Sequence, residues 1–155
     1  SVFSRVLRNE AGRIGYPTNF TIYDTQDSRN AIKAIIKELK LDDKLYRAAA
    51  VQSRISNAKN NLTSPEDYFE NPELMAQDES NGRKEIARIY KRYNVRCKRA
   101  GAMDFDDLLF NTNVLLRDFP DVLLKYQQKF HYILVDEYQD TNFSQYLIIK
   151  KLAAL

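Results

Sequence analysis

The stretch GRKEIARIYKRYNVRCKRAG, residues 82–101, shows the clearest periodicity in the chain. On a helical wheel at 100° per residue, one narrow arc holds its apolar side chains: Ile86, Ile89, Tyr90, Tyr93, Cys97 and Ala100. The opposite half holds its basic side chains: Arg83, Lys84, Arg88, Lys91, Arg92, Arg96, Lys98 and Arg99. This pattern predicts an amphipathic helix whose apolar arc faces a core.

Helical spacing also dominates the rest of the sequence. We expect further helices near residues 1–14, 27–39, 44–60, 64–70, 103–119, 120–130 and 141–155. Asp27 or Ser28 is the expected cap of the second helix, Ser64 that of the fourth and Asp104 that of the helix at 103–119. Leu45 is expected to point inward, and the polar residues 71–82 are expected to form a connection.

Extended structure is expected at two places. Residues 19–24, NFTIYD, form a short extended stretch, and KFHYILVDEYQDTN at 129–142 contains a buried strand over 132–136. A lone hydrophobic strand cannot satisfy its own backbone, so it must belong to a larger sheet. We therefore expect a mainly α chain, excised from a longer protein, with one parallel-type strand.

Composition sets broad limits on the class of protein. The chain has 155 residues, of which 29% are charged and 44% hydrophobic, and its formal net charge is +3. These values are typical of a globular domain and are compatible with nucleic acid. The single cysteine, Cys97, excludes an internal disulfide and favours a reducing compartment. We expect a soluble, cytoplasmic protein without a membrane-spanning segment.

Two adjacent carboxylates, Asp136 and Glu137, follow the predicted strand. Ligands of open α/β sheets lie beyond the carboxyl ends of the strands, and two neighbouring carboxylates suit a divalent cation and phosphoryl transfer. The alternative is that both residues only begin a solvated loop that caps the next helix. The spacing alone leaves these two interpretations open.

The sequence DEYQDTN at 136–142 resembles motif II of the UvrD/PcrA/Rep-like superfamily 1 DNA helicases. Three more segments are similar to that family in order and spacing: SVFSRVLR at 1–8, ISNAKNNL at 55–62 and DFDDLL at 104–109. QYLIIKKLA resembles the helix after motif II. The resemblance covers essentially the whole chain, and Tyr138 points to the Rep/UvrD/PcrA branch.

The resemblance implies a fold: a helical insertion subdomain, 1B, within a partial RecA-like α/β motor segment, 1A. Residues 1–22 and 104–155 would belong to 1A, and residues 23–103 to 1B. It also implies a function, that of an ATP-dependent 3′-to-5′ translocase that unwinds DNA. Asp136 would bind the Mg²⁺ of MgATP, Glu137 would activate the attacking water, and Gln139 would sense the nucleotide. Asp140 or Thr141 is expected to cap the following helix.

The P-loop pattern GxxxxGK[ST] does not occur in these residues. We therefore expect the isolated chain to be inactive, with no Mg²⁺ or ATP tightly bound. Two alternatives to a motor fragment are a helical module that binds DNA or protein, and part of a nuclease-fused helicase. The predicted strand, without its neighbours, would also allow two copies of the chain to associate.

Candidate contacts with single-stranded or duplex DNA lie in three places. They are Arg88 and Arg92 on the basic helix face; Arg54, Lys59 and Asn60 near the AKN segment; and Ser4 and Arg5 close to the N-terminus. The alternative for the helix face is a solvated surface balanced by nearby acids: Asp78, Glu79, Asp106 and Asp107.

Overall fold

The computed structural model describes residues 2–130 and 142–154. The chain divides into two compact units: unit 1 comprises residues 1–20 and 106–155, and unit 2 comprises residues 21–105. Unit 2 contains β1 (Thr21–Tyr23), α2 (Thr25–Glu38), α3 (Ala48–Asn60), α4 (Pro65–Phe69), α5 (Pro72–Ser80), α6 (Ile86–Arg99) and β2 (Ala102–Asp104). Unit 1 contains α1 (Val2–Glu10), the 3-10 helix η1 (Ala11–Ile14), α8 (Pro120–Phe130), α9 (Phe143–Ala153) and all but the first residue of α7 (Phe105–Asp118).

The two strands begin and end unit 2 and pair in parallel, with Ile22 opposite Met103. The chain reaches β2 through a short turn: α6 ends at Arg99, Ala100 is its C-cap, and Gly101 then turns the chain with φ 61°. The Gly101 carbonyl accepts a hydrogen bond from the Thr21 N–H at 2.9 Å. Of the extended stretch predicted at 19–24, Thr21–Tyr23 is therefore a strand. β2 was not predicted, because three residues between two helices are too few to show strand periodicity.

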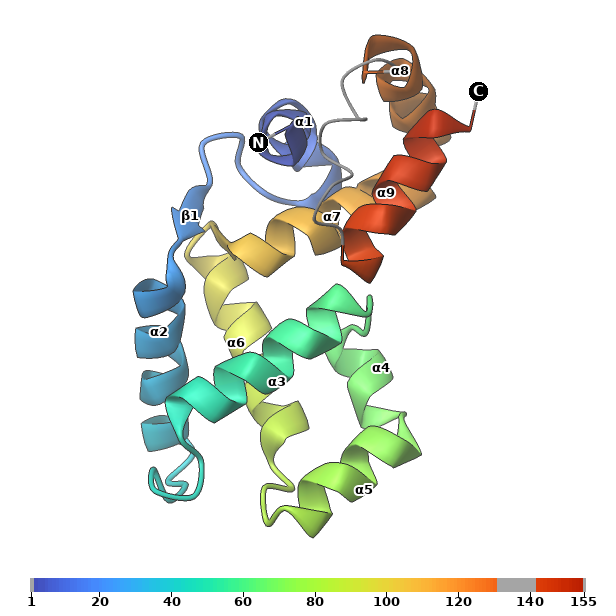
Figure 1. The fold of residues 1–155 in the computed structure, drawn as a ribbon. Coiled ribbons are helices and arrows are strands. Elements are labelled where there is room, and N and C mark those ends of the chain that lie inside the picture. The colour runs from blue at the N-terminus through green and yellow to red at the C-terminus, as the bar shows by residue number, and fades with distance from the viewer. Residues whose placement is uncertain (1, 131–141, 155) are drawn as a thin grey trace. The chain divides into compact units, whose positions relative to one another are not determined.

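Helix α6 forms the core of unit 2 as its periodicity predicts. Ile89, Tyr90 and Tyr93 are buried, and they share one apolar cluster with side chains of α2, α3 and α4. Figure 1 shows α3 crossing α6, with α2 along one side of unit 2 and α4 and α5 on the other. Ala100 departs from the prediction, because it follows the last turn of α6 as its C-cap and is exposed.

The N-terminus of α2 lies earlier than predicted. Asp24 is the cap, rather than Asp27 or Ser28: its side chain accepts the Asp27 N–H at 2.7 Å, and the Asp27 carboxylate accepts the Asp24 N–H at 3.1 Å. This reciprocal capping box satisfies two backbone donors that the helix itself leaves free. Ser28 lies inside the helix and is buried.

Two further predictions about unit 2 are wrong. Leu45 does not point inward, because α3 begins only at Ala48 and the Leu45 side chain remains 41% exposed. Residues 71–82 are not a simple connection, since they contain α5, which Asn71 caps and Pro72 begins. A Pro in the first turn and a side-chain cap are ordinary helix-start features. Helix α4 follows the same design, with Ser64 as its cap as predicted.

In unit 1, α1 buries the four apolar side chains that its spacing predicts: Val2, Phe3, Val6 and Leu7. Helix α8 begins at Pro120 as expected, and α8 packs against α9. The architecture is thus mainly α with a small parallel sheet, and this confirms the predicted fold class. Within the described residues no helix is long and apolar enough to cross a membrane.

Candidate functional site

The residues predicted to bind nucleotide lie outside the described part of the chain. They are Asp136, Glu137 and Gln139, together with the predicted strand over 132–136. The structure does describe what stands on either side of this segment: α8 ends at Phe130, and Asn142 precedes α9. The chemistry predicted for the three residues therefore remains a prediction from the sequence.

Asn142 is the N-cap of α9, since its side-chain oxygen accepts the Gln145 N–H at 2.8 Å. The cap had been expected one or two residues earlier, at Asp140 or Thr141. Asparagine caps as well as aspartate does, because its amide oxygen offers the same acceptor to the free N–H groups of the first turn. Asp140 and Thr141 are consequently not needed as caps.

Side chains of α7 and α8 hold the two ends of α9 within unit 1. Asn113 on α7 donates to the backbone oxygen and hydroxyl of Ser144, at 3.0 and 2.9 Å. Gln127 on α8 donates to the Lys151 carbonyl at 2.8 Å. Asn113 and Ser144 are both buried, so these hydrogen bonds form away from water, where leaving them unmade is costly. They fix the helix that follows the predicted nucleotide-binding motif.

The donor types at 136 and 137 fit a magnesium ion, which prefers carboxylate oxygens. In the described ranges, 2–130 and 142–154, no group of three or more His, Cys, Asp or Glu residues forms a possible metal site.

The predicted DNA contact Lys59 lies in the core of unit 2. Its side chain is 2% exposed, and its ammonium group is 2.9 Å from the Asp104 carboxylate. Tyr93 donates to the same carboxylate oxygen at 2.7 Å, and the Lys59 ammonium lies 4.8 Å from the centre of the Tyr93 ring. Burial raises the pKa of Tyr93, and the negative charge of Asp104 raises it further. This cluster turns Lys59 away from any phosphate, and we leave it out of the DNA-binding surface.

Arg54 is also held by its own unit. Its guanidinium contacts the buried carboxylate of Asp78 at 2.9 Å and the Gln77 side chain at 3.1 Å. Tyr68 donates a hydrogen bond to the other oxygen of Asp78. Burial and that hydrogen bond raise the pKa of Tyr68. Arg54 therefore joins α3 to α5, and a DNA contact would compete with this pairing.

The other candidates are more accessible. Asn60 at the end of α3 is partly buried, Ser4 on α1 is partly buried, and Arg5 on α1 is exposed. Ser4 and Arg5 belong to unit 1, whereas the remaining candidates belong to unit 2. The structure thus does not gather all the predicted DNA contacts into one unit.

Arg88 and Arg92 do come together, in a groove on the surface of unit 2. The groove has a volume of about 390 Å³ and is lined by Phe69, Arg88, Lys91, Arg92, Val95 and Arg99. Its only contribution from another helix is Phe69 of α4, whose side chain is 44% exposed. We call it the α6 groove. The sequence shows the basic stripe, but nothing in the sequence places Phe69 beside it.

Among the acids expected to balance this helix face, Asp78 is engaged elsewhere. Asp78 pairs with Arg54, and the pairs that α6 does make are Arg88 with Glu85 at 3.7 Å and Arg96 with Glu38 at 3.1 Å. Across the described residues, Lys91, Arg92 and Arg99 make no ion pair. The α6 groove therefore keeps most of its positive charge.

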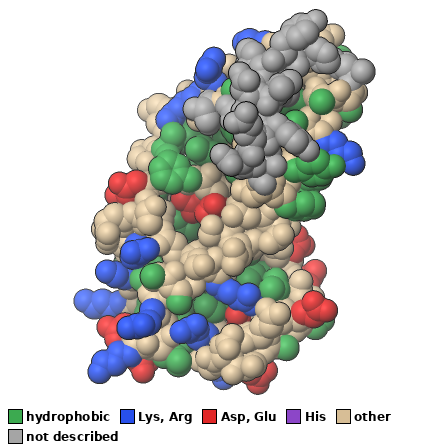
Figure 2. All heavy atoms as spheres, viewed as in Figure 1, with side chains coloured by type: hydrophobic (Ala, Val, Ile, Leu, Met, Phe, Trp, Pro, Cys, Tyr) green, Lys and Arg blue, Asp and Glu red, His purple; other side chains and the backbone are tan. Residues whose placement is uncertain are grey.

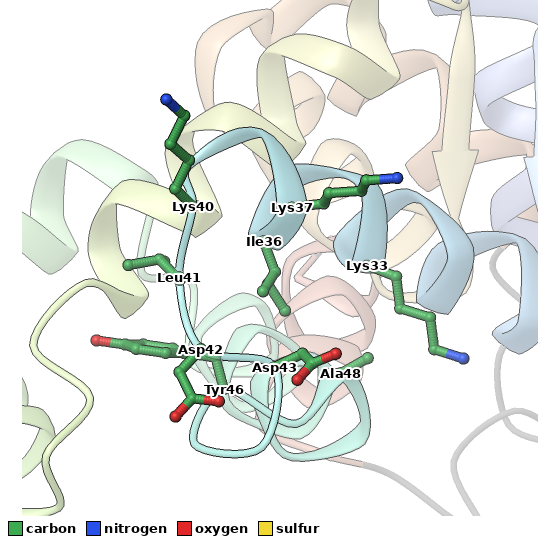
Figure 3. A pocket seen from close by; sticks show the side chains of 9 residues that line it. All are labelled: Lys33, Ile36, Lys37, Lys40, Leu41, Asp42, Asp43, Tyr46 and Ala48. Atoms are coloured by element: carbon green, nitrogen blue, oxygen red, sulfur yellow. The ribbon is translucent and has the colours of Figure 1, made fainter.

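A second and larger pocket, of about 760 Å³, lies where α2 leads towards α3. Figure 3 shows the Lys33, Lys37 and Lys40 ammonium groups pointing away from one another, with Asp42 and Asp43 on the same rim. Figure 2 shows basic side chains gathered over this part of unit 2. The two acids offset much of the positive charge, so this pocket is a weaker site for an anion than its size suggests.

Comparison with known proteins decides the family. A family model described as the UvrD/REP helicase N-terminal domain matches residues 1–155. The chain belongs to the UvrD/REP helicase family. The ATP-dependent DNA helicase PcrA of Staphylococcus epidermidis is 43% identical over 155 residues, and that of Leuconostoc citreum is 42% identical over 149 residues. The ATP-dependent DNA helicase UvrD1 of Mycobacterium tuberculosis is 38% identical over 149 residues.

These matches cover 99%, 96% and 96% of this chain, but only 20%, 19% and 19% of the three relatives. The chain thus spans about a fifth of the length of the UvrD/REP family helicases it matches. Membership in the family confirms the resemblance seen in the sequence. What the whole protein acts on is a separate matter, since four fifths of each relative lie outside the aligned residues.

Proposed function

We propose that this chain is part of the motor of an ATP-dependent DNA helicase that translocates 3′ to 5′ on single-stranded DNA. The match of the family model to all 155 residues carries this proposal, and the DEYQDTN motif at 136–142 supports it. Residues 1–22 and 104–155 would be parts of motor domain 1A, and residues 23–103 would be subdomain 1B. A cytoplasmic location would suit such a protein.

Within this motor, Asp136 would hold the Mg²⁺ of MgATP, and the ion would neutralise charge on the phosphates. Glu137 would accept the proton of the attacking water, because a carboxylate at this position can serve as a general base. Gln139 would couple the state of the nucleotide to the rest of the protein. The roles of all three are assigned from the family motif and the order of the residues.

The isolated chain should hydrolyse no ATP, since it contains no GxxxxGK[ST] segment to hold the β and γ phosphates. The test compares DNA-stimulated phosphate release by the full-length gene product and by the 155-residue chain. We expect turnover only with the full-length protein. Steady turnover by the purified chain, or none by the full-length protein with single-stranded DNA, would contradict the proposal.

A second candidate function is a non-catalytic module that binds DNA or protein. The α6 groove favours a binding role, because three of its four cations, Lys91, Arg92 and Arg99, make no ion pair with any residue that the structure describes. An ATPase measurement on the full-length protein distinguishes the two candidate functions. A motor requires ATP hydrolysis that depends on Glu137, and a binding module does not.

We further propose that copies of the isolated chain associate through the predicted strand over 132–136. The argument is the hydrophobic sequence YILV before Asp136, because a predicted strand of this kind needs a partner strand to satisfy its backbone. Light scattering across a concentration series should show a dimer at high concentration, and Ile133→Pro should abolish it because proline removes a backbone donor. A wild-type chain that stays monomeric would contradict this part of the proposal.

A further inference from the structure

The α6 groove presents one continuous stripe of α6. Its helical residues are Arg88, Lys91, Arg92, Val95 and Arg99. At 100° per residue these positions fall within an arc of about 100°, and at 1.5 Å per residue they extend for about 16 Å. The stripe thus offers four cations in a row on a rigid element, with one apolar side chain among them.

Phe69 lies beside this stripe because its neighbour is firmly anchored. Tyr68 is buried, and its ring packs edge-to-face on Tyr90 of α6 with centroids 6.1 Å apart. The Tyr90 hydroxyl in turn donates to the Thr63 carbonyl at 2.8 Å, just before α4. Helix α4 is therefore fixed on α6, and this holds in place the backbone that carries the exposed ring of Phe69.

We propose that the α6 groove binds single-stranded nucleic acid, with phosphates on Arg88, Lys91, Arg92 and Arg99 and a base stacked on Phe69. Cations that follow the backbone and an aromatic ring that stacks on a base are the recurring elements of such sites. The inference rests on the proposed function, since a motor that separates strands produces this ligand. The inference adds to the proposed function a contact surface in unit 2, and it assigns this surface to single-stranded DNA.

The chemistry of the α6 groove favours a single strand over other polyanions. The bases of a duplex are stacked on one another, so an exposed ring cannot stack on them without disrupting the helix. Polyglutamate, an acidic peptide without apolar side chains, would use the cations but leaves the ring of Phe69 and the side chain of Val95 without matching groups. The pocket in Figure 3 lacks both features, because its lysines diverge and two carboxylates lie among them.

Fluorescence anisotropy tests the proposal with a labelled 20-nucleotide oligo-dT on the 155-residue chain, without ATP. Phe69→Ala should weaken binding about 5- to 150-fold, the range that base stacking on an aromatic ring commonly contributes. Phe69→Tyr should retain it. Lys91→Ala combined with Arg92→Ala should lower the slope of log affinity against log salt by about 1.4, at about 0.7 per contact.

The matched control removes two lysines from the other pocket, Lys33→Ala with Lys37→Ala. Both residues are exposed on α2, so this variant loses the same charge without touching the α6 groove. We expect it to bind oligo-dT within about twofold of wild type. Equal losses in the two double variants would overturn the proposal. So would tighter binding of a 20-base-pair duplex, or an equal effect of Phe69→Ala on binding of polyglutamate.

Crosslinking locates the contact independently of affinity. A bromodeoxyuridine oligonucleotide irradiated with the chain and digested with trypsin should modify the peptide 60–83, which contains Phe69. Crosslinks confined to other peptides would overturn the assignment. The two proposals fail separately: a full-length protein without ATP hydrolysis would contradict the motor, and a chain without this binding would contradict only the α6 groove.

Discussion

Lys59 and Asp104 show how residues far apart in the sequence determine the role of a charged side chain. Lys59 is part of the AKN segment that suggests a DNA contact, but its partner Asp104 lies 45 positions later. Sequence spacing cannot show that the end of α3 meets the end of β2. The structure assigns Lys59 to a buried ion pair that ties α3 to the small sheet. Tyr93 of α6 donates a further hydrogen bond to the Asp104 carboxylate.

Removing one partner of this pair should be costly. Lys59→Met leaves the Asp104 carboxylate buried without its cation, and we expect the free energy of unfolding to fall by about 3–5 kcal/mol. Urea unfolding followed by circular dichroism measures the change. Replacing both partners, Lys59→Met with Asp104→Leu, should recover most of the loss, because no charge then remains buried. A single variant that loses less than about 1 kcal/mol would contradict this role.

Tyr93 should make the stability of unit 2 depend on pH in the alkaline range. The folded protein raises the pKa of Tyr93, so the unfolded chain loses this proton first, near pH 10. The contribution of Tyr93 to the free energy of unfolding should therefore stay constant below pH 10 and fall as the pH rises above 10. Urea unfolding between pH 8 and 11 should show a smaller fall for Tyr93→Phe than for wild type. Parallel curves for the two proteins would contradict the assignment.

At the scale of elements, periodicity predicts faces better than ends. The apolar arc of α6 and the four buried residues of α1 were predicted from spacing alone, because 3.6 residues per turn leave a clear pattern. Spacing alone does not predict where α2 begins or that α5 exists. Two acids, Asp24 and Asp27, lie near the start of α2, and either could be its cap. Helix α5 has a weak apolar pattern, and the side chain that it buries is the charged Asp78.

The capping box of α2 gives a direct test at this scale. Asp24→Ala removes the acceptor for the Asp27 N–H, and we expect it to destabilise the chain by about 1 kcal/mol. Lys33→Ala, an exposed change within the same helix, should have little effect. The midpoint of urea unfolding distinguishes the two variants. The box would have no energetic role if Asp24→Ala unfolded at the same midpoint as Lys33→Ala.

The residues of the candidate site likewise fall into those that spacing predicts and those that only the packing of the helices brings together. The basic stripe of α6 follows from spacing, and Arg88 and Arg92 were singled out from it. The sequence pattern does not predict Phe69 as part of the site, because only the packing of Tyr68 on Tyr90 brings α4 to that stripe. Arg54 was expected to face DNA, and its pairing with Asp78 of α5 depends on a helix that the sequence pattern did not show.

At the scale of the whole molecule, the family assignment and the motor chemistry rest on different grounds. The first rests on the match of all 155 residues to the UvrD/REP helicase N-terminal domain. The second rests on the DEYQDTN motif, above all on Glu137 as the proposed general base. This chain spans about a fifth of the length of its relatives, and the proposed motor would need segments outside that fifth, such as a P-loop. The decisive experiment therefore belongs to the full-length protein.

The most direct test is the rate of ATP hydrolysis by full-length protein carrying Glu137→Gln, measured with single-stranded DNA. The change keeps the shape of the side chain and removes its capacity to accept a proton, so the turnover rate should fall by about 10²- to 10⁴-fold. Asp140→Asn removes one negative charge from the same motif and serves as the control, with a rate within a few-fold of wild type. A Glu137→Gln protein that hydrolyses ATP as fast as this control would contradict the assignment of this chain to a working motor.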